Sequence, residues 1–230
     1  MSSEEKIKNI LVFTWDRNSD DKPADYTGAF LPEALAFMKY HNIPSANHLR
    51  VDLSKTESTR RQRVYDFIKK RNKEIGPIDG IAFFCHGLTR KIQLGIRISD
   101  LENFAYLLKG VVEAQSKQIV IALYCCSTGD GPGVGGDSGF ADKLRDSLCQ
   151  VGLTDCSILA HSVSGHTTKN TMKRKFDGMG SPVGGVGGLS IVNPSTILWK
   201  KWKTAITTTP FRYKIPFMTI AEIHKELDDK

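Results

Sequence analysis

Two short, continuously apolar segments constrain the fold of this chain more than any other feature. They are IDGIAFFC at residues 78–85 and QIVIALY at residues 118–124. A strand with one solvated face alternates polar and apolar residues, whereas an unbroken apolar run is typical of a strand covered on both faces. Such strands occur in parallel sheets with helices packed on both sides. The two segments therefore predict an α/β fold.

The rest of the chain alternates between strand and helix patterns that complete this fold. Strands are expected at 8–14, 49–53, 78–85, 118–124 and 157–160, and helices at 31–40, 58–73, 101–112 and 138–148. Parallel neighbours need a crossover long enough to hold a helix, so this order predicts a mostly parallel sheet with helices on both faces. Ligands bind such sheets beyond the carboxyl ends of the strands, which is where catalytic residues are expected.

The composition predicts a single domain. With 230 residues, 40% of them hydrophobic, the chain can bury one large core. A basic C-terminal extension from about residue 191 is too short to form a core of its own, so one domain is expected over residues 1–230. The glycine-rich stretch at 178–188 breaks the pattern and is expected to be a loop or lid within that domain.

Compartment and redox state follow from hydropathy and from the cysteines. No apolar run reaches the roughly 18 residues of a membrane-spanning helix, and the N-terminal residues lack the apolar stretch of a secretion signal. The five cysteines are an odd number, and Cys125 and Cys126 are adjacent, which is unlike a disulfide framework. We expect a cytoplasmic protein with at least one free thiol and no membrane contact.

Basic residues exceed acidic ones, with a formal net charge of +7. The excess gathers in three clusters, at residues 60–73, 169–175 and 199–214. Such stripes can track a phosphate backbone, and Trp199 and Trp202 could stack on bases. No nucleic-acid-binding motif accompanies the charge, so a solvated basic surface is the favoured interpretation. The alternative function is a non-catalytic binding module that uses this basic surface, with nucleic acid as one candidate ligand.

The two apolar strands end in residues suited to nucleophilic catalysis. The first is followed by His86 and Gly87, and the second by Cys125 and Cys126. If the strands are neighbours, their carboxyl ends bring an imidazole and a thiol together at one sheet edge. A thiolate can attack a carbonyl carbon, and an imidazolium can protonate the leaving amine. Gly87 lets the backbone approach a substrate and offers its N–H to a developing oxyanion, as the N–H of Cys126 can.

These two motifs together resemble those of the caspase-like cysteine peptidases, a clan that includes caspases, metacaspases, gingipains, separases and the CHAT peptidases. The segment LYCCSTG at 123–129 is most similar to the CHAT pattern, in which a small residue, Cys, any residue, Thr and Gly follow the strand. The segment GFADKL at 139–144 resembles that group's helix, and the resemblance covers about residues 78–165. It implies a caspase-hemoglobinase-like fold, peptide hydrolysis through a thioester acyl-enzyme, and neither a metal nor an organic cofactor.

The resemblance also implies a role for each site residue. Cys126 would be the nucleophile, His86 the general acid and base, and the backbone N–H groups of Gly87 and Cys126 the oxyanion hole. The motif places the nucleophile three residues before the glycine of Thr-Gly, which favours Cys126 and leaves Cys125 in the small-residue position. Tyr124 stands where a metacaspase-like pattern has an acidic residue that binds a basic P1 side chain, so P1 specificity stays open.

Further polar residues follow these strands and are candidates for substrate binding. Asp130 and Asp137, with Asp142, come shortly after the nucleophile, and any of them that faces the cleft would favour Lys or Arg at P1. His161 and His166 follow another strand at the same rim and could shape a substrate pocket. Cysteine and histidine are zinc ligands, but the CxxC and HxxxH spacings are missing, so no metal is expected.

Two glycine-rich loops, at 129–139 and 178–188, suggest regulation of the site. Glycine loses more backbone entropy than other residues when a loop orders. We therefore expect the isolated chain to be weakly active until substrate, a partner or loop cleavage orders these loops. The expected partners are a protein or peptide substrate and an activating or regulatory protein.

Overall fold

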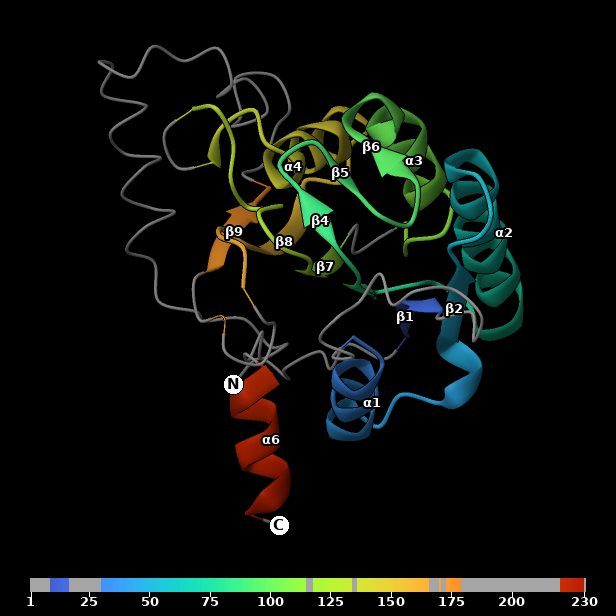
Figure 1. Cartoon of the computed structure of the whole chain (residues 1–230). Coiled ribbons are helices and arrows are strands. Elements are labelled where there is room, and N and C mark those ends of the chain that lie inside the picture. Colours follow the sequence, from blue (N-terminus) through green and yellow to red (C-terminus); the bar gives the residue numbers. More distant parts are fainter. Residues whose placement is uncertain are drawn as a thin grey trace, which may run out of the picture.

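The protein is built on a six-stranded mixed sheet with the strand order β2-β1-β3-β7-β8-β9 (Figure 1). The computed structural model describes residues 9–16, 30–114, 118–133, 136–165, 170, 173–178 and 220–229. The strands are β1 (Ile10–Asp16), β2 (His48–Asp52), β3 (Gly80–Phe84), β7 (Gln118–Tyr124), β8 (Asp155–His161) and β9 (Lys173–Asp177). All neighbours pair in parallel except β9, which is antiparallel to β8. The predicted α/β fold with a mostly parallel sheet is confirmed.

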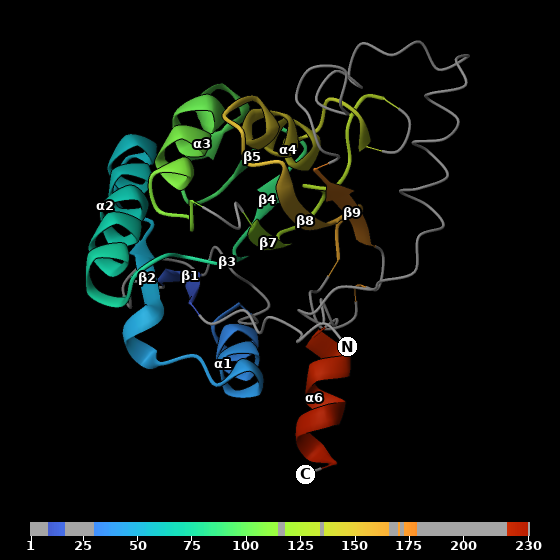
Figure 2. The same ribbon diagram turned by 180° about the vertical axis from the view of Figure 1, so that it is seen from behind.

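Helices cover both faces of this sheet. They are α1 (Phe30–His41), α2 (Glu57–Ile75), α3 (Leu101–Lys109), α4 (Phe140–Gln150) and α6 (Ile220–Asp228). Figure 1 and the reverse view in Figure 2 show α1 and α6 against one face and α2, α3 and α4 against the other. The sheet is therefore the middle layer of three.

The two apolar segments form the central strands of the sheet, as their composition predicts. Every residue of β3 is buried, as are six of the seven residues of β7. Successive side chains of a strand point to opposite faces. The ring of Phe83 accordingly lies 6.3 Å from that of Phe104 in α3, while Phe84 packs 5.6 Å from Phe37 in α1. Unbroken hydrophobicity is required because both faces of β3 are covered.

A small antiparallel sheet was not expected from the sequence. It contains β4 (Gly87–Leu88), β5 (Lys91–Ile92) and β6 (Ile96–Arg97), in that order. Strands of two residues are too short to show an alternating pattern, so the sequence carries no signal for them. This sheet follows directly after His86, so it anchors one side of the sheet edge where catalytic residues are expected.

Strand β9 and helix α6 also lie outside the predicted elements. The sequence of β9 is KRKFD, and its charged residues are those of an edge strand, which does not read as an apolar run. Helix α6 lies within the expected C-terminal extension. Its Ile220 and Ile223 are fully buried in the same hydrophobic core as the central strands.

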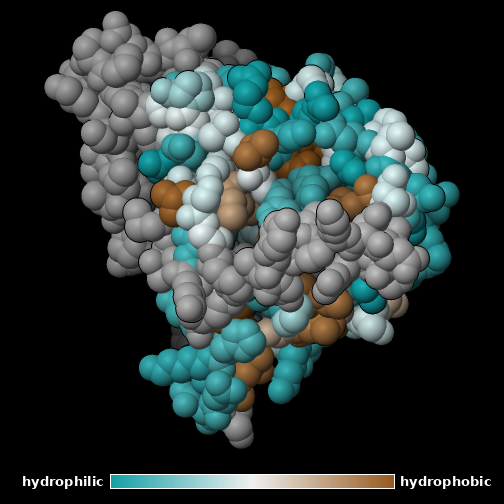
Figure 3. Space-filling view, in the orientation of Figure 1, coloured by the Kyte–Doolittle hydropathy of each residue, from teal (hydrophilic) through white to brown (hydrophobic). Residues whose placement is uncertain are grey.

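The described surface is mostly hydrophilic. In Figure 3 the apolar residues on the described part of one face form small, separate patches among hydrophilic ones. Among the residues that the structure describes, the exposed large hydrophobic side chains are those of Leu35, Leu88, Tyr106 and Val163. Scattered apolar residues of this kind are normal on a protein surface.

Several sequence-based expectations concern residues that lie outside the described ranges. They are His166, the loop at 179–188 and the basic cluster at 199–214. Among the residues that are described, no helix is both long enough and apolar enough to cross a membrane.

Candidate active site

The ends of β3 and β7 lie side by side and form the frame of the site. The strands pair in parallel up to Phe84 and Tyr124, so His86 and Cys126 each stand two residues beyond the last matched pair. Contact between the strand ends continues past this pair. A Cβ built on Gly87 would lie 2.6 Å from the carbonyl oxygen of Cys126, which is too close for any residue but glycine. The sheet register thus brings the His-Gly and Cys motifs together.

His86 is held from the side of α1. Its ring centroid lies 4.9 Å from that of Phe30 in an edge-to-face arrangement and 5.7 Å from that of Trp15. Phe30 opens α1 and Trp15 lies near the end of β1, so two further elements position the imidazole. His86 as a residue is half-buried, whereas the strand residues before it are buried.

The two adjacent cysteines have different surroundings. Cys125 is fully buried, and its Sγ lies 3.5 Å from Sγ of Cys85 and 3.5 Å from the carbonyl oxygen of Phe83. Burial, followed by the Cys85 thiol, raises the pKa of Cys125 well above its usual value, so it is a poor thiolate. Cys126 is partly exposed, and its thiol donates to the carbonyl oxygen of Gly165 at 3.4 Å.

A tight turn after β7 carries Cys126 out of the sheet. Ser127 has a φ of 55°, in the left-handed region that non-glycine residues rarely adopt. The Thr128 hydroxyl donates to the Cys125 carbonyl oxygen at 2.9 Å, and the Gly129 N–H donates to the His161 carbonyl oxygen at 2.8 Å. These bonds hold a kinked backbone directly beside the exposed thiol.

The expected aspartates after the nucleophile are engaged elsewhere. Asp130 forms an ion pair with Arg174 of β9 at 3.3 Å, and Arg174 also donates to the Gly129 carbonyl oxygen at 2.9 Å. Asp137 is buried, and its burial, followed by the charge of Asp142, raises its pKa. Asp130 is therefore tied to β9, and Asp137 is enclosed within the loop that follows Cys126.

Asp142 also has a structural environment. It is fully buried on α4, where it accepts the Ser138 N–H at 3.0 Å and pairs with the buried Arg145. The preceding loop is closely packed, since a Cβ on Gly133 would lie 2.6 Å from Cβ of Asp137. The contacts therefore assign Asp142 to anchoring the loop that follows the nucleophile.

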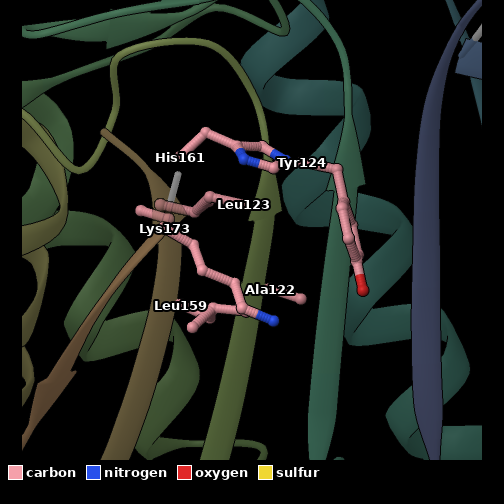
Figure 4. A pocket seen from close by; sticks show the side chains of 7 residues that line it. Ala122, Leu123, Tyr124, Leu159, His161 and Lys173 are labelled. Atoms are coloured by element: carbon pink, nitrogen blue, oxygen red, sulfur yellow. The ribbon is translucent and has the colours of Figure 1, made fainter. Parts of the chain in front are cut away.

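His161 lines a small pocket between β7, β8 and the start of β9 (Figure 4). It is buried at the end of β8, and its ring lies 6.1 Å from that of Tyr124. Lys173 contributes its side chain and lies 3.8 Å from Glu222 of α6, while burial lowers the lysine pKa. The Tyr124 ring stacks on Phe84 at 4.5 Å, and burial raises its pKa.

Some residues of the site were missed at the sequence level. Trp15 and Phe30 contact His86, and Gly165 accepts from the Cys126 thiol, but each of these contacts joins separate elements. Thr128 lies in a Cys-x-Thr-Gly pattern at 126–129, and this pattern is the one sequence signal that points to it.

Comparisons with protein families, curated proteins and solved structures found no match for this chain. Within the described residues, no group of three or more His, Cys, Asp or Glu side chains is arranged to hold a metal ion. A function for the chain must therefore be argued from the geometry at the ends of β3 and β7.

Proposed function

We propose that this chain is a cysteine endopeptidase with a caspase-hemoglobinase-like fold, most similar in its motifs to the CHAT peptidases. The observation that carries the proposal is the register of β3 and β7, in which His86 and Cys126 follow the last matched pair at equal distances along neighbouring strands. A thiol and an imidazole at one edge of a sheet are the two groups that peptide hydrolysis by a thiolate requires.

The proposed reaction proceeds in two stages. His86 takes the proton of the Cys126 thiol, and the thiolate attacks the carbonyl carbon of the scissile peptide bond. The resulting oxyanion accepts hydrogen bonds from the N–H groups of Gly87 and Cys126. The His86 imidazolium then protonates the leaving amine, the C–N bond breaks, and a thioester remains. Water, deprotonated by His86, hydrolyses this thioester and restores the thiol.

The surroundings of the two adjacent cysteines support Cys126 as the nucleophile. Its thiol is accessible, whereas Cys125 is buried with a raised pKa. A nucleophile must reach the substrate and ionise near neutral pH, and the buried thiol is unsuited to both. All five cysteines are free thiols, which supports a reducing, cytoplasmic location.

The alternative, a binding module for nucleic acid, has less support from the described residues. Lys173, Arg174 and Lys175 each lie within ion-pair distance of a carboxylate. On α2, Arg61 pairs with Asp100, and the Arg71 guanidinium pairs with a glutamate one turn along the helix. Paired cations contribute less to binding phosphates than unpaired ones do.

The substrate is a protein or peptide, and its P1 preference is the property least constrained by the site. Of the two aspartates expected to attract a basic P1 side chain, Asp130 pairs with Arg174 of β9 and Asp137 is buried. A fluorogenic peptide library varied at P1 measures the preference directly. If basic P1 residues are strongly preferred and Asp130→Asn removes that preference, Asp130 binds substrate despite its contact with Arg174.

Thiol labelling coupled to activity tests the proposal. Iodoacetamide at neutral pH is expected to modify Cys126 before the other four cysteines and to abolish peptide hydrolysis in the same proportion. Peptide mapping by mass spectrometry identifies the labelled thiol. Equal labelling of all five cysteines, with no hydrolysis of any peptide, would refute the enzyme and favour the binding module.

A further inference from the structure

Thr128 contacts three elements that build the proposed site. Its side chain is fully buried, and its hydroxyl donates to the Cys125 carbonyl oxygen at 2.9 Å. Its own carbonyl oxygen accepts the Ala141 N–H of α4 at 3.0 Å. Its methyl group packs on the loop after β3, since a Cβ built on Gly87 would lie 2.7 Å from Cγ2 of Thr128. One residue therefore connects β7, α4 and the His-Gly loop.

The hydroxyl of Thr128 acts on a particular peptide unit. The carbonyl group of Cys125 and the N–H group of Cys126 belong to the same planar peptide bond. In a trans peptide these two groups point in opposite directions, so a bond that holds the carbonyl also fixes the direction of the N–H. In the proposed mechanism, that N–H is one of the two donors to the oxyanion.

The methyl group of Thr128 acts on the other proposed donor. Gly87 lies against Thr128 Cγ2, Cys125 Cβ and the Cys126 carbonyl oxygen, so the glycine backbone is confined on the side of the nucleophile turn. The anchor of Thr128 on Ala141 keeps this contact in place. Thr128 thus contacts Gly87 directly, and it reaches the Cys126 N–H through its hydrogen bond to the carbonyl oxygen of the same peptide unit.

We propose that Thr128 is a positioning residue that aims the backbone N–H groups of Cys126 and Gly87 at the oxyanion. This inference rests on the proposed function and names a residue that acts through others, without touching the substrate. Preorganised donors act when charge develops in the transition state, so the loss of their alignment lowers kcat more than it changes KM.

Two substitutions separate the hydroxyl from the methyl group. Thr128→Val keeps the shape and removes the hydrogen bond, and it is expected to lower kcat about 10- to 100-fold with KM within about threefold of the native value. Thr128→Ser keeps the hydroxyl but loses the methyl contact with Gly87. It is expected to lower kcat by about threefold, which is less than the loss in Thr128→Val. A role in packing alone would give the opposite order, with Val better tolerated than Ser.

The rate of Cys126 alkylation distinguishes a positioning role from a merely structural one. A structural disturbance of the site would change this rate, whereas the loss of oxyanion-hole alignment would not. The reaction of a thiolate with iodoacetamide forms no oxyanion, so Thr128→Val is expected to keep the native alkylation rate within about twofold. Binding of a peptide aldehyde, which forms a tetrahedral oxyanion with the thiol, should weaken by about the same factor as kcat. If alkylation and kcat fall together in Thr128→Val, or if kcat is unchanged, the inference is wrong.

A matched control comes from another buried threonine. Thr14 on β1 is fully buried and its hydroxyl hydrogen-bonds to Nε2 of His48 at 2.7 Å. Thr14→Val also removes one buried hydroxyl, but is expected to leave kcat and aldehyde binding within about twofold of native. Measurements on the native chain test the proposed function separately from the role of Thr128. If the native chain hydrolyses no peptide and Cys126 is not selectively alkylated, the proposed function itself fails.

Discussion

Cys125 and Cys126 are neighbours in the chain but belong to two different regions of the molecule. Cys125 follows directly after the buried strand β7, where it contacts the thiol of Cys85, the residue after β3, and is fully shielded from solvent. Cys126 begins the turn beyond the strand, where its thiol is partly exposed. One peptide bond thus separates a thiol in the hydrophobic core from one at the surface.

This difference shows that position in the fold, more than residue type, assigns chemistry to a thiol. Burial favours the neutral form of Cys125 and keeps any substrate away from it. The left-handed conformation of Ser127 turns the chain immediately after Cys126, so the next residues leave the sheet. The turn therefore defines the site, and the strand end below it provides a rigid base.

The largest expected effect comes from replacing each of the two cysteines by alanine in turn. Cys126→Ala should lower kcat by at least about 10⁴-fold, because the acyl-enzyme cannot form. Cys125→Ala should keep kcat within about threefold and lower the free energy of unfolding by about 1 kcal/mol, since it leaves a small cavity in the core. Peptide hydrolysis and denaturant unfolding measure these effects. If Cys125→Ala abolished hydrolysis and Cys126→Ala retained it, Cys125 and not Cys126 would be the nucleophile.

The second largest effect is expected at the imidazole. His86→Ala should reduce kcat by about 10² to 10⁴-fold, because both proton transfers depend on it. The same variant should also slow alkylation of Cys126 at neutral pH. Quenched labelling over a range of pH, followed by mass spectrometry, measures the rate of Cys126 alkylation. A His86→Ala variant with native alkylation and native hydrolysis would exclude His86 as the base.

A smaller effect is expected when the two strand ends are forced apart. Gly87→Ala places a Cβ 2.6 Å from the Cys126 carbonyl oxygen and 2.8 Å from Cβ of Cys125, so the backbone must shift. We expect about a 100-fold loss in kcat and a loss of about 1–3 kcal/mol in the free energy of unfolding.

Gly110→Ala is the matched control for Gly87→Ala. At Gly110 the nearest atom to a built Cβ is 3.4 Å away, and the position lies at the end of α3. Its kcat should stay native. Similar kinetic losses in both variants would show that the contact between the strand ends does not matter for activity.

The smallest effect concerns the free energy of unfolding and a histidine outside the proposed site. Burial lowers the pKa of His41, at the end of α1, to about 4. The folded protein therefore holds this imidazole neutral, while the unfolded chain takes up a proton below about pH 6.5. The contribution of His41 to the free energy of unfolding is fully present above pH 6.5. It is lost as pH falls toward 4, by about 2–3 kcal/mol.

His41→Gln isolates this contribution, because its side chain does not titrate. Denaturant unfolding at pH 7.5 and pH 4.5 should show a smaller acid-induced loss in the variant than in the native chain. Equal losses would place the acid sensitivity elsewhere. The pH profile of kcat should be the same in both, since His41 lies outside the proposed site.

The architecture could largely be inferred from the sequence, because its signals are local. The unbroken apolar runs that became β3 and β7 follow from burial on both faces, and the helical spacing between them marks the crossovers. The elements that were missed have weak local signals: two-residue strands in the small sheet, a charged edge strand in β9, and α6, whose Ile220 and Ile223 reach the core from the far end of the chain.

What the sequence determined by itself about the site is its set of residue types: a His-Gly and a Cys motif, each following an apolar strand. Only the tertiary structure decided that β3 and β7 are neighbours in matching register, that Asp130 pairs with Arg174, and that Thr128 contacts the loop of Gly87. Strand order and ion pairing depend on residues far apart in the chain. Such contacts are set by how the packed elements meet, and no local pattern encodes them.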